Sequence, residues 1–382
     1  MQNILFIVQT NTVSGAEIVL ENYLKEMDEN ENLFLLTNNE VKNFYSEVFK
    51  ETNIYSKKSM KRVYFSKNPF NYLQFISYIL INIFAIHKIV KKHQIDVLYG
   101  NNSIDTVLIT MYKMLADNRI KVVAHLHSII EKNSMIGSFL DRFAHRLDHI
   151  IVPSNATKQS VKELIGNRTP VTTVYNGIDI PEKKKKTDYS SVASSLGLPE
   201  GKQIIAFVGA VEGRKRPDLF LSIIQNLSKL RDDFFAIIVG KTENEELKET
   251  LQKRIKEEEL PVKIIGLVDY EVMMSLYEII DYLILTSDRD PLPTVILESM
   301  AHGKIAISRD VDGAREMIQH QENGFLFPYE MSSEDAAKIV NDALGLSDEE
   351  KELIRKNARE TINKTFNNQI KSEKINSILQ SL

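Results

Sequence analysis

Short runs of Ile, Val, Leu and Phe alternate with longer amphipathic segments along the whole 382-residue chain. The runs show no strict polar–apolar alternation, which is typical of strands buried on both faces of a parallel sheet. The helix-length segments between them predict repeated βαβ units. The predicted strands are residues 4–8, 33–37, 96–101, 121–127, 150–153 and 171–175, followed by 204–209, 235–240, 262–266, 282–286 and 305–308.

The two series of strands are separated by residues 180–203, which carry a lysine run and a serine-rich stretch but no apolar period. This break predicts two doubly wound, Rossmann-like α/β domains. In such folds ligands bind at the carboxyl ends of the strands, so we expect a site in a cleft between the domains. The predicted divisions are a first domain at 1–180, a linker and domain entry at 181–202, a second domain at 203–360, and a C-terminal helix at 361–382 that packs back on the first domain.

Composition excludes several classes of function. The net charge of -4 argues against a nucleic-acid binder, and the absence of cysteine excludes disulfides, thiol catalysis and cysteine-ligated metals. The N-terminus has neither the basic start nor the cleavage site of a secretory signal. The uncharged stretch 73–86 is too short to span a bilayer. We therefore expect a cytoplasmic protein without a transmembrane helix.

The sharpest motif lies at residues 286–300, where a strand is followed by a short acidic loop and an amphipathic helix. The backbone N–H groups and the dipole of the first helical turn favour an anion such as a diphosphate. The helix is predicted to begin around Pro293, and Leu292, Pro293 and Thr294 are candidate nucleotide-sugar-binding residues. Asp290 precedes the helix and Glu298 lies more than one turn into it, so that one acid can face a sugar and the other a ribose. The alternative is an ordinary helix-end charge and a solvated glutamate.

A second group of candidates belongs to the first domain. Gly15 and Glu17 follow the first strand, where glycine lets the backbone approach a phosphate or sugar closely. His125 and His127 occupy alternate positions at the end of a strand and therefore point to the same side. The alternatives are a glycine needed by any βα turn and a hydrogen-bonded structural histidine.

The start of the second domain, residues 207–218, combines a strand, Gly209 and a basic cluster before a helix. This combination suits a diphosphate, although a solvated basic turn would have the same composition. The cluster contains Arg214, Lys215 and Arg216. Gly240 and Leu267 end the next two strands, where apolar walls and backbone groups could bind a ligand, or simply form βα turns. Glu316 follows a later glycine loop and is a secondary candidate.

The pair Asp290 and Glu298, followed by Ser-Met-Ala-His-Gly, resembles the acidic pair of retaining glycosyltransferases with the GT-B fold. The large family four of these enzymes is the closest match, and the resemblance covers nearly the whole chain. The family usually has Glu where this chain has Asp290. It also has Arg at the position of Ala210, while Lys215 matches the family lysine.

The resemblance implies a hexosyltransferase of bacterial type, whose second domain binds a nucleotide-diphosphate sugar and whose first domain binds the acceptor. It implies that Glu298 binds ribose, that Asp290 contacts the donor sugar, and that Lys215 stabilises the departing diphosphate. His127 would contact the sugar, with His125 secondary. Either Arg214 or Arg216 would replace the arginine missing at position 210.

The expected donor is a UDP-sugar, and the expected acceptor is a glycan, a lipid-linked molecule or a protein, in cell-surface polysaccharide or glycoconjugate synthesis. No cofactor and no metal are expected, since GT-B enzymes usually supply positive charge from side chains and helix dipoles. The Asp288–Asp290 pair is therefore interpreted as coincidental. Two alternatives remain: a non-catalytic glycosyltransferase-like binding partner, and a nucleotide-sugar epimerase.

The basic segment 57–62 precedes a predicted apolar helix at residues 71–92. A basic and apolar surface would suit peripheral contact with an anionic membrane, at the inner face of the cell membrane. The alternative, which we favour for residues 73–86, is a helix packed on the first sheet beside a solvated loop.

Overall fold

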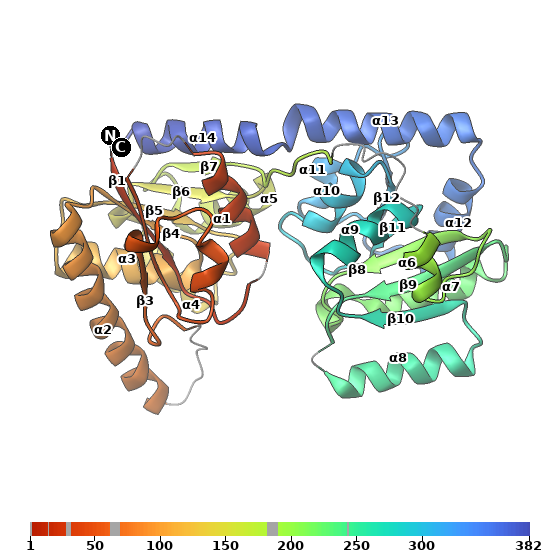
Figure 1. The fold of residues 1–382 in the computed structure, drawn as a ribbon, viewed down its shortest axis with the longest axis horizontal. Coiled ribbons are helices and arrows are strands. Elements are labelled where there is room, and N and C mark those ends of the chain that lie inside the picture. Colours follow the sequence, from red (N-terminus) through yellow and green to blue (C-terminus); the bar gives the residue numbers. More distant parts are fainter. Residues whose placement is uncertain (1, 14, 28–31, 62–68, 182–189, 243) are drawn as a thin grey trace. The chain divides into compact units, whose positions relative to one another are not determined.

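The structure is a computed structural model that describes residues 2–13, 15–27, 32–61, 69–181, 190–242 and 244–382, apart from the side chains of residues 69–74, 190 and 270. The chain forms two compact units. The first unit is Met1–Gly177 together with Asn368–Leu382, and the second is Ile178–Asn367 (Figure 1).

The first unit contains a seven-stranded sheet in the order β3-β2-β1-β4-β5-β6-β7. Every neighbouring pair is parallel, as the pairing of β1 with both β2 and β4 illustrates. The strands are β1 (Asn3–Val8), β2 (Asn32–Thr37), β3 (Ile54–Ser56), β4 (Val97–Gly100), β5 (Lys121–His125), β6 (His149–Val152) and β7 (Val171–Thr173).

Helices cover both faces of this sheet. Successive residues of β1 point to opposite faces, so that Leu5 and Ile7 join one buried cluster while Ile4 and Phe6 join another. The first cluster includes residues of α2, α3, α4 and α5, and the second includes residues of α1 and α14. The helices are α1 (Gly15–Lys25), α2 (Pro69–His93), α3 (Ser103–Leu115), α4 (Met135–Phe143), α5 (Asn155–Ile165) and α14 (Asn368–Gln380).

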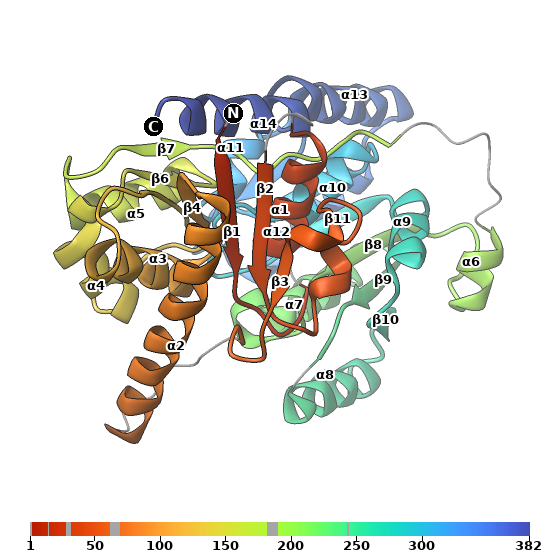
Figure 2. The same ribbon diagram turned by 60° about the vertical axis from the view of Figure 1, so that its left-hand side comes forward.

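The second unit contains a six-stranded parallel sheet in the order β10-β9-β8-β11-β12-β13. Figure 2 labels four of these strands, β8 to β11. Its strands are β8 (Gln203–Val208), β9 (Phe234–Val239), β10 (Val262–Gly266), β11 (Tyr282–Leu285), β12 (Ile305–Arg309) and β13 (Phe325–Phe327). Its helices are α6 (Ser190–Ser195), α7 (Pro217–Leu227), α8 (Glu245–Glu257), α9 (Tyr270–Ile279), α10 (Thr294–Ala301), α11 (Ala314–Met317), α12 (Ser333–Leu344) and α13 (Asp348–Thr365).

Helix starts in both units follow from local side-chain chemistry. Ser154 caps α5 and Asn102 caps α3 by accepting hydrogen bonds from backbone N–H groups of the first turn. The start of α13 is a capping box, in which Ser347 and Glu350 satisfy each other's backbone N–H groups. Such caps fix where a helix begins because the first-turn N–H groups have no partner within the helix.

The prediction of two doubly wound, Rossmann-like domains with parallel sheets is confirmed. The first predicted strands of the two domains correspond to β1 and β8, which are interior strands of their sheets. The two units meet in the chain at 177/178 and 367/368, whereas the predicted boundaries were 180, 203 and 361. Residues 361–365 continue α13 in the second unit, where Ile362 is buried. The lysine run at 183–186 lies outside the described residues.

Candidate functional site

Three consecutive strands of the second unit end on glycines with positive φ. These are Gly209 after β8, Gly240 after β9 and Gly266 at the end of β10, with φ of +140°, +147° and +87°. A Cβ on Gly240 would lie 1.8 Å from the carbonyl oxygen of Gly209, whereas nothing lies within 4 Å of a Cβ on Gly209. Only glycine fits at position 240, and the space beside Gly209 is open to a ligand that approaches the backbone. Leu267 follows Gly266 and is 73% exposed.

Lys215 and Asp290 form an ion pair beside these strand ends. Lys215 ends a short 3-10 helix (Gly213–Lys215), and Asp290 lies in the loop before α10. The side chains are only 17% and 10% exposed. The backbone N–H of Asp290 donates to a carboxylate oxygen of Asp312 at 2.9 Å, and burial raises the pKa of Asp312. Two residues that the sequence placed in one site are therefore in direct contact, a contact that local patterns do not encode.

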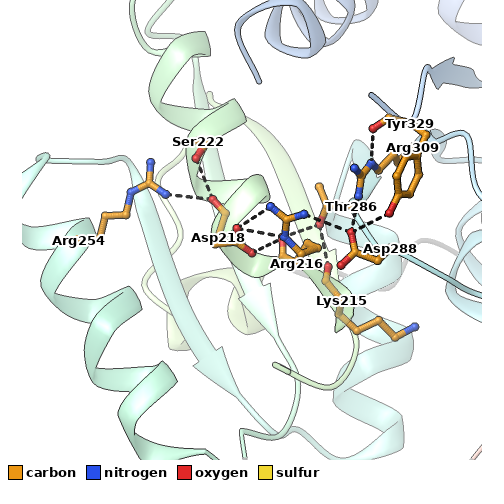
Figure 3. Close-up of polar contacts among 9 residues, drawn as sticks. All are labelled: Lys215, Arg216, Asp218, Ser222, Arg254, Thr286, Asp288, Arg309 and Tyr329. Carbon is orange, nitrogen blue, oxygen red and sulfur yellow. Dashed lines mark hydrogen bonds and ion pairs between the residues drawn. The ribbon is translucent and has the colours of Figure 1, made fainter. Parts of the chain in front are cut away.

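A cluster around Asp288 holds this loop in place (Figure 3). Oδ1 of Asp288 accepts hydrogen bonds from Arg216 at 3.2 Å and from Arg309 at 2.6 Å. The Arg309 guanidinium lies 3.7 Å from the ring centroid of Tyr329 and donates to the Tyr329 carbonyl. The Thr286 hydroxyl reaches the carbonyls of Lys215 and Arg216, each at 2.9 Å. Sequence reasoning missed Arg309 because nothing at the end of β12 distinguishes it from a surface arginine.

The two arginines left open by the sequence have different surroundings. Arg216 adopts φ +54° at the start of α7 and donates to Asp218 and Asp288, so its charge is balanced by two carboxylates. Arg214 is half exposed, pairs with Glu212 at 2.8 Å and donates to the Arg289 carbonyl at 2.9 Å. Arg214 is therefore the more accessible cation beside Lys215 and Asp290.

Glu298 lies on α10 and accepts a 2.5 Å hydrogen bond from the hydroxyl of Tyr277 on α9. The pKa of Glu298 is raised, chiefly by burial, while hydrogen bonds from Tyr277 and Thr294 oppose the shift. The Tyr277 ring is fully buried and stacks on His302, with centroids 5.2 Å apart. This arrangement fixes one carboxylate oxygen of Glu298. Tyr277 was not identified from the sequence, since it sits in an ordinary amphipathic helix.

The other predicted residues of the second unit lie around the same loop. The helix α10 begins at Thr294, with Pro293 at its N-cap position and Leu292 buried. A Cβ on Gly313 would lie 2.1 Å from the Pro291 carbonyl, so the loop before α11 packs tightly against the loop before α10. Glu316 is on α11.

In the first unit the two predicted histidines stand side by side at the end of β5. Their ring centroids are 4.0 Å apart. His125 contacts the Tyr99 hydroxyl at 2.7 Å, and His127 contacts the Asn101 side-chain oxygen at 3.2 Å. Burial, with a further contribution from the Lys371 charge, lowers the pKa of His127 to about 3 and that of His125 well below its usual range. Both rings are therefore neutral near pH 7.

The start of α1 packs against these residues. The Asn101 amide donates to the Ala16 carbonyl at 3.2 Å, between Gly15 and the buried Glu17. Asp105 on α3 is fully buried, and burial raises its pKa well above the usual range. Sequence reasoning missed Tyr99 and Asn101, which become neighbours of the histidines only through the sheet order. It also missed Asp105, which accepts a hydrogen bond from the backbone N–H of Gln9. Ser14, the first residue of the predicted glycine loop, lies outside the described residues.

Within the described parts of both units, no group of three or more His, Cys, Asp or Glu side chains is arranged to hold a metal ion. None of the helices described is both long and apolar enough to cross a membrane.

The two parallel-sheet units, each with polar residues gathered at the carboxyl ends of its strands, define the GT-B class of fold. Residues 13–182 match the family model "Glycosyltransferase Family 4", and residues 190–361 match the model "Glycosyl transferases group 1". The chain belongs to the GT-B glycosyltransferases of the family-four type, and it is a transferase. The predicted family and the predicted enzyme class are thus confirmed.

Relatives and solved structures agree with this assignment. The chain is 22% identical over 325 residues to N-acetyl-alpha-D-glucosaminyl L-malate synthase of Bacillus anthracis, covering 82% of this chain and 81% of the relative. It is 24% identical over 333 residues to the O-antigen biosynthesis glycosyltransferase WbnH of Escherichia coli, covering 85% and 86%. The crystal structure of Anabaena Alr3699/HepE in complex with UDP and glucose superposes with a TM-score of 0.82 at 22% identity, covering both chains completely. That likeness shows the fold.

Proposed function

We propose that this glycosyltransferase moves a hexose or N-acetylhexosamine from a UDP-sugar to a glycan, lipid-linked or protein acceptor in the synthesis of a cell-surface polysaccharide or glycoconjugate. The observation that carries the donor assignment is the gathering of Lys215, Asp290 and the glycine strand ends at one edge of the second sheet. Support comes from the complexes of Anabaena Alr3699/HepE with UDP and with UDP-glucose, and from the O-antigen enzyme named above. The cytoplasmic location stays a prediction.

In the proposed complex the diphosphate lies beside the cations and the exposed glycine backbone. Lys215 and the accessible Arg214 would neutralise its charge, and the space next to Gly209 would let backbone approach an oxygen closely. Glu298, held by Tyr277, would accept hydrogen bonds from ribose hydroxyls with its second oxygen. Asp290 would exchange its contact with Lys215 for one with a hydroxyl of the donor sugar.

The proposed reaction retains the configuration of the sugar. The bond from the anomeric carbon to the diphosphate oxygen breaks, and the acceptor oxygen bonds to the same face of that carbon. The acceptor's proton goes to the departing phosphate oxygen. Lys215 stabilises the negative charge that grows on this phosphate. His127 would contact a sugar hydroxyl as a neutral imidazole, because its lowered pKa prevents it from acting as a cation at pH 7.

The test is release of UDP from UDP-glucose and UDP-N-acetylglucosamine, measured in excess chelator. We expect turnover to persist without metal, because side chains and the helix dipole supply the positive charge. Lys215→Ala should lower kcat by about a hundredfold, whereas Lys229→Ala, at an exposed lysine of the same unit, should leave it unchanged. Complete loss of activity in chelator, restored by magnesium, would instead assign the Asp288–Asp290 pair to a metal.

Binding of UDP with no turnover of either donor would favour the alternative of a non-catalytic binding partner. The anomeric configuration of the product, read by NMR, tests retention separately. An inverted product would contradict the proposed same-face substitution while leaving the donor site intact.

A further inference from the structure

The helix α2 carries large apolar side chains that no other described part of the chain covers. Ile76, Leu80, Ile81 and Phe84 are between 54% and 59% exposed. Twelve large hydrophobic residues of the described chain are at least 37% exposed, and four of them lie within residues 76–84. Such grouping is unusual for a solvent-facing helix and marks a surface that contacts something apolar.

The exposed residues form one stripe along the helix. Ile76, Leu80 and Phe84 follow each other at a spacing of four residues, and Ile81 lies beside them, which places all four on one face. The opposite face carries Ile79 and Ile86, which are buried in the core of the first unit. The preferred sequence interpretation, a helix packed on the sheet, thus describes only one face. The outward face is equally apolar.

Positive charge continues the stripe toward the end of the helix. Lys88 occupies the next position of the same face, and its ammonium lies 4.5 Å from the ring centroid of Phe84. Lys91 and Lys92 follow and are exposed. The helix contains neither Asp nor Glu along its length. Apolar side chains are therefore bordered by cations without an acidic residue among them.

The basic loop 57–61 contacts the same helix through side chains. The Ser59 hydroxyl donates to the side-chain oxygen of Asn82 at 2.8 Å, and Met60 is buried in the core that α2 also joins. Lys57, Lys58 and Lys61 are exposed. The predicted basic segment thus belongs to the surroundings of α2, with Arg62 outside the described residues. In Figures 1 and 2 the N-terminal end of α2 extends beyond the sheet of the first unit.

We propose that this face of α2, defined by Ile76, Leu80, Ile81, Phe84 and Lys88, docks the protein on the surface of an anionic lipid bilayer. A bilayer surface offers hydrocarbon to the apolar stripe and lipid phosphates to the lysines. A helix that lies in the plane of the membrane interface needs both kinds of contact. The charge pattern argues for this occupant, because an apolar protein partner would not need the cations. The proposal goes beyond the donor assignment and does not depend on it.

The test is co-sedimentation of the full chain with vesicles of phosphatidylcholine alone and of phosphatidylcholine mixed with phosphatidylglycerol. We expect binding to the anionic vesicles, weakened by salt. The double variant Leu80→Ser/Phe84→Ser should bind about tenfold or more weakly, since two apolar side chains no longer enter the membrane. Lys88→Gln/Lys91→Gln should bind more weakly to anionic vesicles only. Leu353→Ser, at a residue 58% exposed on α13, is the matched control and should bind like the wild type.

Equal vesicle binding by the wild type and the Leu80/Phe84 variant would overturn the proposal, as would no binding by the wild type. Light scattering after size-exclusion chromatography tests whether a second copy of the chain occupies this face. A wild-type dimer that the double variant abolishes, without vesicle binding, would show that the face is a contact between two copies. Thermal shift by UDP, measured on the same variants, keeps this outcome separate from failure of the donor assignment, because the substituted residues lie in the other unit.

Discussion

Lys215 is placed so that its charge is already balanced before any ligand arrives. The Lys215 ammonium pairs with the Asp290 carboxylate. The backbone N–H of Asp290 donates a hydrogen bond to Asp312. A largely buried pair of this kind contributes little net stability when intact, but its disruption leaves one uncompensated charge. The pair therefore couples the proposed catalytic lysine to the loop that carries the proposed sugar-binding acid.

We predict that Lys215→Ala lowers the free energy of unfolding by about 2–4 kcal/mol, because the largely buried side chain of Asp290 then loses its ion-pair partner. The double variant Lys215→Ala/Asp290→Ala should recover most of this loss. Urea unfolding of the wild type, both single variants and the double variant measures the coupling. Additive losses in the double variant would show that the two side chains do not interact in solution.

The paired histidines of the first unit predict a loss of stability in acid. Their pKa values are lower in the folded chain than in the unfolded chain, where histidine titrates near 6.5, so the unfolded chain binds more protons below that pH. Stability should therefore be complete above about pH 6.5 and fall as the pH drops toward about 3, by up to ~1.4 kcal/mol per pH unit for each histidine.

Unfolding free energies measured between pH 7 and pH 4 check this expectation. His127→Gln should reduce the slope, and His145→Gln, at an exposed histidine of the same unit, should not. An unchanged slope in the His127 variant would mean that this ring is already protonated or solvated in the folded state.

At the scale of elements, the ends of β8, β9 and β10 carry the glycines on which the proposed donor site depends. The backbone of Gly209 crosses directly beside Gly240, so these two strand ends fit together only without a Cβ at position 240. The same principle holds at Gly313, whose neighbour is the Pro291 carbonyl. At these positions the backbones of neighbouring loops of the proposed donor site lie in close contact.

We predict that Gly240→Ala lowers the free energy of unfolding by more than about 2 kcal/mol, because the new methyl meets a backbone oxygen and φ is strained. Gly213→Ala is the control, since nothing lies within 4 Å of its added Cβ. Differential scanning calorimetry compares the two. Equal melting temperatures for the two variants would show that the strand ends can separate at little cost.

The elements also show what a sequence can and cannot predict. Uninterrupted apolar runs predicted the long central strands, because burial on both faces leaves a local signature. The strands β3 and β13, three residues each, were missed, although the equally short β7 was predicted within residues 171–175. Contacts such as Tyr277 with Glu298 and Arg309 with Asp288 depend on which elements the fold brings together, which no local pattern contains.

At the scale of the whole molecule, the two units contain similar parallel sheets but carry different residues at their strand ends. At the strand ends of the second unit lie the Lys215–Asp290 ion pair and the accessible backbone of Gly209. Those of the first unit carry neutral histidines and buried acids, and α2 adds an apolar outward face. The family assignment covers both units. The proposed division of labour follows: donor on the second unit, acceptor on the first, and membrane contact through α2.

The most direct test of the central claim is calorimetric titration of UDP and GDP into the wild type, Glu298→Ala and Tyr277→Phe. We predict that UDP binds more tightly than GDP. Glu298→Ala should weaken UDP binding by more than about tenfold, since a hydrogen bond to a charged group contributes about 1.5–3 kcal/mol. Tyr277→Phe should have a smaller effect in the same direction, because it frees the carboxylate without removing it. Wild-type affinity for UDP in the Glu298 variant, or tighter binding of GDP, would contradict the proposed donor site.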